Sequence, residues 1–548
     1  MRGIRARGVI GIVLAAVLIV GAIGGWMLMA SEDAEDEPIV VGTTVAPTMV
    51  DPAGTYDAGG WALVSNLYQS LLTIVPGQEA PAPDAASSCQ FTDNQLTVYR
   101  CTLRAGLRFS NGDQVTPQDV QFSYERILAM ADRAEREAAD DSIPEDEKFQ
   151  YAGPASLLDT LEAVRVDGQD IIFELSKPNA TFPFVVASPV GAIVNDASYE
   201  EHEPRTDGEV VGSGPFLLTE FEPNEQAELE PNPTYVGAAQ IPQHPVTVRY
   251  FVESDDGGRA DDKLAEAWEQ GELDVNAGDM PPEVMENIGP GGGDERVHES
   301  AGGDIRVMAF NTDPGMAMSD PAARRAVAAE LDREAIARHI QHGTVDPLYS
   351  LIPVGFAGAS TPYYDAYDAQ EIDPEEMRQQ LVDAGLEVPV KFELAYSRGA
   401  ASHEEAELIE AQLEANGLFD VTIDYHDWSQ EFIPTIFGER SFDAYLIGWV
   451  PDYPDPGTFV DLLGPADGLA TGYSEPAINE LLDGTQAEAD RARAARDFET
   501  INELAAEDAP IIPIWQAKHI TISDDSIAGA EYLSDNSGIW RLWELYRL

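Results

Sequence analysis

The sequence predicts an α/β protein of about three domains. It has 548 residues, several times the roughly 150 of an ordinary domain, and 44% of them are hydrophobic, which is enough for a large core. After Ile305 the chain alternates between short apolar runs and amphipathic segments, a pattern typical of strands joined by helical crossovers. Ligands of such sheets usually lie at the ends of the strands.

The first half of the chain predicts strands and helices separated by turn-forming residues. A strand at 39–44 leads through a Gly-rich loop into a helix with leucines at fourfold spacing from Leu63 to Leu71. Thr116, with Asp119 three residues later, predicts a capped helix start. Further strands are predicted at 171–175, 216–221, 227–230, 246–252 and 273–275, a helix at 261–268, and a surface excursion at 76–88.

The second half predicts helices that begin at aspartates. Asp320 and Asp373 each precede a proline, and the helices they start should end before Gly343 and at Gly385. Ser402 and Glu405 predict a capping box for a helix that closes at residue 417. Strands are predicted at 390–396, 421–425, 442–449 and 511–514, and a last helix at 487–508.

The stretch FDAYLIGWVPDYPDPGTFVDLL, at 442–463, predicts a recognition loop. A buried strand runs into a segment stiffened by three prolines, and Trp449, Asp452 and Tyr453 lie on it. The alternative is a proline turn with solvated carboxylates and a core tryptophan. Asp455, which precedes a proline, is expected to cap the following helix.

The N-terminus predicts a membrane anchor. Arg2, Arg5 and Arg7 precede an uncharged run at 8–31, which exceeds the about 20 apolar residues needed to span a bilayer. The arginines should stay inside, so that the body of the chain lies outside the cell. A cleaved signal peptide, with secretion of the rest of the chain, is the alternative.

The composition is strongly acidic, with 98 Asp and Glu against 32 Lys and Arg and a formal charge of −66. Such a polyanion repels nucleic acid and anionic lipid surfaces. The charge indicates a solvated surface adapted to a saline or external medium, although attraction of cationic ligands is an alternative.

Cys89 and Cys101 are the only cysteines and flank a predicted turn and strand. They can close a hairpin-scale disulfide, which persists outside the cytoplasm. Two unpaired buried thiols are the alternative.

Motifs for catalysis, metals and cofactors are missing. His403 and Glu404 are followed by Glu407 where a zinc protease helix would place its second histidine. The acidic group at 253–258 lacks the spacing of a calcium loop, and no nucleophile elbow or phosphate-binding loop occurs. We therefore expect no enzyme activity, no catalytic residues, no metal and no cofactor.

Several stretches together resemble the extracellular solute-binding proteins of the oligopeptide and dipeptide class, which feed ABC importers. They are LRAGLRFSNGDQVTPQDVQFSYERIL at 103–128, VVGSGPFLLTEFEPNEQAELEPNPTYVG at 210–237, GELDV at 271–275, FNTDP with DPAARRAVAAELDREAI within 310–336, and GWVPDYPDP at 448–456. These matches follow the family's order, and the resemblance covers nearly everything after residue 38.

The resemblance implies a two-lobed periplasmic-binding-protein-like (class II) fold with an extra α+β domain, preceded by the N-terminal membrane segment 1–37. Domain I would be assembled from 38–66, 188–304 and 510–548, domain II would be 67–187, and an α/β domain III would be 305–509. The ligand would lie in a cleft that hinge closure encloses.

The resemblance also implies the ligand site and the partners. Asp452 would pair with a peptide's α-amino group, and the backbone from Gly448 to Val450 would pair with its main chain. Trp449 and Tyr453 would supply an apolar wall. The loop with Tyr56 and Ala58 would face them. The partners would be a short peptide, an ABC permease and its ATPase, for a monomer on the outer face of the membrane. The alternative ligands are a nickel complex, an opine, a sugar or an antibiotic. The less favoured function is that of a membrane-anchored hydrolase or sensor.

Overall fold

The structure is a computed structural model, and it describes residues 37–548 except 79, 141, 254–257, 279, 282–283, 286–294, 370–372, 398–401, 465–467 and 536–538. The predicted anchor at 8–31 and most of the acidic group at 253–258 lie outside the described residues. Among the helices of the described part, none is long and apolar enough to cross a membrane.

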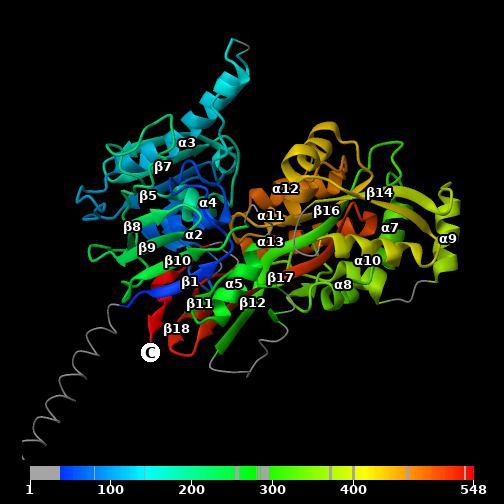
Figure 1. Ribbon diagram of the computed structural model, residues 1–548. Coiled ribbons are helices and arrows are strands. Elements are labelled where there is room, and N and C mark those ends of the chain that lie inside the picture. Colours follow the sequence, from blue (N-terminus) through cyan, green and yellow to red (C-terminus); the bar gives the residue numbers. More distant parts are fainter. Residues whose placement is uncertain are drawn as a thin grey trace, which may run out of the picture.

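One 11-stranded sheet runs through most of the molecule (Figure 1). Its order in space is β15 (Phe419–Tyr425), β14 (Val390–Tyr396), β16 (Ala444–Trp449), β12 (Glu295–Phe310), β17 (Ile511–Asp524), β11 (Val275–Asn276), β1 (Ile39–Thr43), β10 (Val246–Tyr250), β9 (Gln226–Pro231) and β8 (Phe216–Glu222), with β13 (Val345–Pro347) on β17. The long antiparallel pair β12 and β17 joins the two ends of this sheet. Because β17 pairs with both β11 and β12, the sheet is continuous across the predicted domains I and III, whose boundaries stay predictions.

A second sheet has four antiparallel strands in the order β4 (Ala86–Phe91), β5 (Val98–Leu103), β7 (Asp170–Leu175) and β6 (Leu161–Asp167). The long helix α3 (Pro117–Ala138) covers it, with Val120 and Tyr124 in one core with Phe173. The predicted cap is confirmed, since Thr116 and Asp119 form a reciprocal capping box. A disulfide joins Cys89 and Cys101 across the hairpin β4–β5, which confirms the predicted pairing. The surface excursion expected at 76–88 is wrong in part, because Ala85 and Ala86 are fully buried where β4 begins.

The first half also contains α2 (Ala58–Leu67), β2 (Leu72–Thr73), β3 (Ala82–Pro83), α4 (Phe182–Ala187) and α5 (Ala260–Glu269). Two short strands near the end of the chain, β18 (Ile527–Ala528) and β19 (Tyr546–Arg547), pair with each other. In Figure 1 α2, α4, β18 and the four-stranded sheet lie on one side of the long pair β12–β17, and α7–α10 lie on the other.

Helices cover both faces of the sheet after residue 305. They are α7 (Pro321–Glu330), α8 (Arg333–His339), α9 (Pro374–Asp383), α10 (Ser402–Glu414), α11 (Gly457–Val460), α12 (Pro476–Gln486) and α13 (Arg491–Asp508). Leu446 of β16 packs in one core with α7, α9 and α10, and its neighbour Ile447 packs in another core with α11, α12 and α13. β14 is parallel to both β15 and β16, as the predicted crossover connections require.

Three helix predictions need correction. The helix predicted from 320 to 343 is split into α7 and α8, because Asp332 accepts a hydrogen bond from the backbone of Ala335 and caps a new helix. The helix predicted to start at 487 starts at Arg491, after α12 has ended at Gln486. The predicted capping role of Glu405 is wrong, since its buried carboxylate pairs with Arg306 (2.9 Å) and accepts a hydrogen bond from Trp515.

Candidate functional site

The predicted recognition loop leaves the end of β16. Trp449 is the last residue of this strand and lies opposite Ile305 of β12. Pro451 packs against Gly303, where an added Cβ would come within 2.7 Å of the proline ring. Gly303 lies in the irregular part of β12, where the pairing with β17 shifts. The sheet therefore holds the start of the loop through the close contact between Pro451 and Gly303, which only glycine permits.

One edge of β16 is open near this loop. β12 pairs with β16 along all of Ala444–Trp449, whereas β14 pairs only with Ala444 and Tyr445. Beyond Tyr445, no strand of the described part pairs with the edge that faces β14. Gly448 is exposed, and Val450 just beyond the strand is 63% exposed. Unpaired backbone of this kind can bind an extended chain through main-chain hydrogen bonds.

Asp452 lies on this loop and contacts the other half of the molecule. The Tyr56 hydroxyl donates a hydrogen bond of 2.6 Å to its Oδ1 atom, across 396 positions of sequence. Tyr56 lies between β1 and α2, next to the exposed Ala58 that begins α2. The structure thus brings together two loops that the sequence singled out separately.

Burial raises the pKa of Asp452, and the hydrogen bond from Tyr56 opposes this effect. Within the described residues, no lysine, arginine or histidine forms an ion pair with Asp452, and its Oδ2 atom accepts no hydrogen bond. The pKa of Tyr56 is also raised, first by burial and then by the charge of Asp452. The Tyr56 residue is 40% exposed. Asp452 is therefore a partly buried carboxylate without a cationic partner among the described residues.

Tyr453 joins a third segment to the same place. Its hydroxyl lies 3.3 Å from the Thr181 hydroxyl, to which it donates, and its ring stacks on Phe184 of α4 with the ring centres 6.1 Å apart. Burial raises the pKa of Tyr453, so the phenol stays neutral. Neighbouring residues of one loop thus contact two separate segments of the opposite half.

A buried network fixes the loop that carries Tyr56. The carboxylate of Asp51 forms two hydrogen bonds, of 2.7 and 2.9 Å, with the guanidinium of Arg126 on α3. Both side chains are at most 1% exposed. Asp51 also accepts hydrogen bonds from the backbone amides of Ala53 and Arg205. A buried charge pair is stable only with such complete hydrogen bonding, and here the bonds shape the turn that precedes Tyr56.

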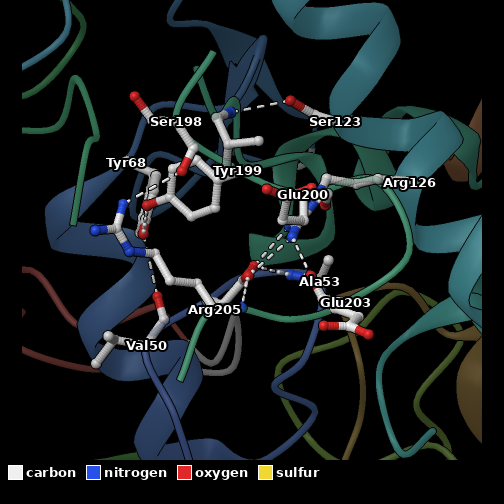
Figure 2. Close-up of polar contacts among 12 residues, drawn as sticks. Val50, Ala53, Tyr68, Ser123, Arg126, Ser198, Tyr199, Glu200, Glu203 and Arg205 are labelled. Carbon is white, nitrogen blue, oxygen red and sulfur yellow. Dashed lines mark hydrogen bonds and ion pairs between the residues drawn. The ribbon is translucent and has the colours of Figure 1, made fainter. Parts of the chain in front are cut away.

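Figure 2 shows how further segments join this network. Arg126 donates to the backbone carbonyls of Glu200 and Glu203, and the Tyr68 and Tyr199 hydroxyls share a hydrogen bond of 2.7 Å. The Tyr68 hydroxyl also contacts the carbonyl oxygen of Val50. The loop that presents Tyr56 is therefore tied to α2, to α3 and to the segment around residue 200.

Asp455 makes the predicted contact with the following helix and a second contact that was not predicted. Its Oδ1 atom accepts a hydrogen bond of 2.8 Å from the Gly457 amide at the start of α11. Both carboxylate oxygens also bind Arg491, at 2.7 Å each, and the Asp455 side chain is 1% exposed. Asp455 therefore also joins the loop to the start of α13.

Comparison with known proteins places the chain in a family. The sequence pattern described as "Bacterial extracellular solute-binding proteins, family 5 Middle" matches residues 80–469, more than half of the chain. The protein is a family 5 extracellular solute-binding protein. Members of this family are non-catalytic binding receptors, in agreement with the expectation that the protein is not an enzyme.

Relatives and solved structures match over nearly the whole length of this solute-binding protein. The probable D,D-dipeptide-binding periplasmic protein DdpA of Escherichia coli K12 is 24% identical over 90% of both chains. DppA from Helicobacter pylori, solved with the peptide STSA, has a TM-score of 0.71 and 21% identity, covering 95% of this chain and 99% of that one. AgaA from A. tumefaciens R10, solved with agropinic acid, has a TM-score of 0.71 and 20% identity, covering 93% and 99%. These structures share the mixed α/β binding-protein fold of this chain.

Two other features of the solute-binding protein lie apart from Asp452. A cavity of about 100 Å³ is lined by residues of α2, of the segment 70–76 and of the C-terminal segment, and by none of the predicted ligand residues. Glu393, Asp424 and His426 have potential metal-ligand atoms within 4.8 Å of one another. The His426 Nε2 atom lies 3.1 Å from the Asp424 carboxylate within this cluster.

The sequence missed the residues that hold the site together. Asp51, Thr181, Phe184 and Arg491 gave no recognisable signal, because each acts through a partner far away in the sequence. Arg126 did offer a signal, since it lies beside the apolar residues of α3 and a buried arginine requires a carboxylate or carbonyl partner.

Proposed function

We propose that this solute-binding protein captures short peptides outside the cell and delivers them to an ABC importer formed by a permease and its ATPase. Asp452 pairs with the peptide's α-amino group, and the open edge of β16, from Gly448 to Val450, pairs with its main chain. Tyr453, Trp449 and the loop with Tyr56 and Ala58 enclose the first residue of the peptide. In this proposal the protein is a monomer tethered by residues 8–31, and the ligand induces closure of the cleft.

The observation that carries this proposal is the partly buried carboxylate of Asp452, which has no cationic partner among the described residues. An ammonium group would supply the missing charge through a charge-assisted hydrogen bond. The unpaired backbone of β16 next to this carboxylate supports an extended ligand rather than a compact one. The peptide STSA in the DppA complex and the dipeptide in the name of DdpA agree with this ligand class.

Titration calorimetry on the full chain with tri-alanine tests the amine pairing. Asp452→Ala should weaken binding by about 2 to 5 kcal/mol, or roughly thirty- to several-thousandfold, because the ammonium would be buried without a partner. The melting temperature of the ligand-free variant should stay close to that of the parent. N-acetylated tri-alanine, which lacks the charge, should bind the parent protein poorly.

The matched control is Asp365→Asn, which removes one exposed carboxylate elsewhere in the chain and should leave the affinity for tri-alanine unchanged. If Asp452→Ala binds tri-alanine like the parent, the amine pairing is wrong. Incubation of the parent with peptide mixtures should yield bound, uncleaved peptide, and cleavage would contradict a receptor function.

The second candidate is a ligand of another class, favoured by the equal structural similarity to AgaA with agropinic acid. Mass spectrometry of the small molecules that co-purify with the protein separates the two candidates. Peptides would support the proposal, and a single non-peptide compound would replace it.

A further inference from the structure

The Tyr56 hydroxyl binds one of the two carboxylate oxygens of Asp452. It donates to Oδ1 at 2.6 Å, while the Oδ2 atom accepts no hydrogen bond from the described residues. This leaves one oxygen available to a ligand and the other held by the protein. The donor comes from the opposite side of the molecule, in the loop between β1 and α2.

The Tyr56 hydroxyl is held in place from both sides of the loop. Asp51 shapes the preceding turn through Arg126, as described above. On the other side, Asp57 accepts hydrogen bonds from the Gly60 amide and the Thr55 hydroxyl, both at 2.7 Å, and so caps α2. The ring of Tyr56 lies 5.6 Å from that of Trp61 on α2. The fixed loop and this ring contact restrict the positions that the Tyr56 side chain can take opposite Asp452.

We propose that Tyr56 is a positioning residue that orients the Asp452 carboxylate, so that its free Oδ2 atom selects a cationic ligand. This inference rests on the proposed function, in which that ligand group is a peptide's α-amino group. A hydrogen bond to the charged form of an acid favours that form, whereas burial favours the neutral form. Tyr56 thus counteracts the burial of Asp452 without introducing a positive charge that would compete with the ligand.

Of the two tyrosine hydroxyls at this loop, only that of Tyr56 binds Asp452. The Tyr56 hydroxyl comes from the opposite loop, and the Tyr453 hydroxyl comes from its own loop and donates to Thr181 instead. No lysine, arginine or histidine of the described part pairs with Asp452, so burial raises its pKa and only the Tyr56 hydrogen bond opposes this rise.

The sign of the pH dependence follows from these contacts. Ligand binding requires the Asp452 carboxylate, so affinity for tri-alanine falls as the pH drops through the pKa of Asp452. Tyr56→Phe removes the hydrogen bond that favours the carboxylate, and the loss of affinity then begins at a higher pH. We call the pH range in which affinity is lost the acid limb. Given the usual strength of a hydrogen bond to a charged group, its removal should move this limb upward by about one pH unit.

Two measurements on the full chain, in molar salt, test the inference. The first is the affinity for tri-alanine as a function of pH in the parent, Tyr56→Phe and Thr181→Val. Thr181→Val removes the hydroxyl that accepts from the neighbouring Tyr453 but leaves the contact between Tyr56 and Asp452 in place. Tyr56→Phe should shift the acid limb upward, and Thr181→Val should leave its position unchanged. Equal acid limbs in the parent and Tyr56→Phe would overturn the inference.

The second measurement needs no ligand. Tyr56→Phe should lower the melting temperature at neutral pH, and the deficit should shrink in acid, where Asp452 is protonated and the lost hydrogen bond matters less. A purely structural role would give a deficit that does not change with pH, and this result would also overturn the inference. If tri-alanine fails to bind the parent at every pH, the proposed function fails, and the melting temperatures alone decide the role of Tyr56.

Discussion

Asp452 and Asp455 lie three residues apart on one loop but have opposite surroundings. Asp455 is almost completely buried and binds Arg491 through both oxygens. Asp452 is partly buried, yet it has one neutral donor and no cation among the described residues. The comparison teaches that burial alone does not define a role for a carboxylate. A satisfied carboxylate holds the loop in place, and an unsatisfied one is available to a ligand.

The largest effect should come from breaking the satisfied pair. Asp455→Ala leaves Arg491 buried without its partner, which typically costs about 3 to 5 kcal/mol. Denaturant unfolding of the ligand-free variant measures this loss. A loss of about 1 kcal/mol, the usual value for a helix cap, would mean that the contact with Gly457 is the more important one.

The control for this prediction is ionic strength. With a formal charge of −66, the parent should gain stability between dilute buffer and molar salt, because salt screens self-repulsion over a Debye length of about 10 Å at 0.1 M. The cost of Asp455→Ala should be the same in both buffers, since a buried pair is screened little. A cost that falls sharply with salt would place the pair at the surface.

A smaller effect of opposite sign should follow from Asp452→Asn. The pKa of Asp452 is raised by burial, so the ionised group destabilises the fold above that pKa, and stability recovers as the pH falls through it. Asparagine can still accept the Tyr56 hydrogen bond but carries no charge. The ligand-free variant should therefore be more stable at neutral pH, by about 1 kcal/mol, the common size of a point-mutation effect. The gain should vanish in acid, and a loss of stability at neutral pH would contradict the reasoning.

The smallest effect is expected at an exposed ion pair. Arg205 and Asp207 lie 2.6 Å apart, but the Asp207 side chain is 57% exposed. Asp207→Ala should change the free energy of unfolding by at most about 1 kcal/mol, because water competes for both charges. Chemical denaturation measures this change on the same scale as Asp455→Ala. Equal losses of unfolding free energy for the two variants would show that burial does not determine how much these ion pairs stabilise the fold.

Local patterns in the sequence predicted much of the fold. The structure confirms the helix starts predicted from the capping box at Thr116 and from the aspartates before Pro321 and Pro374. Such caps are predictable because they depend on residues only a few positions apart. The predicted strand at 442–449 corresponds to β16, and the loop that follows it does bring Asp452 to Tyr56. Where a local pattern competed with a distant partner, as for Glu405 with Arg306, the prediction was wrong.

By itself the sequence determined the class of the chain, through the alternation of strands and helices and the family motifs that the family match confirms. It left the pairing of Cys89 with Cys101 open, and the structure decided it. Only the tertiary structure decided which carboxylate is satisfied. Asp51 and Asp455 find arginines that lie 75 and 36 positions away, and Asp452 finds a tyrosine 396 positions away. The physical reason is that ionisation and hydrogen bonding of a buried group depend on the atoms around it in space, which residue spacing along the chain does not specify.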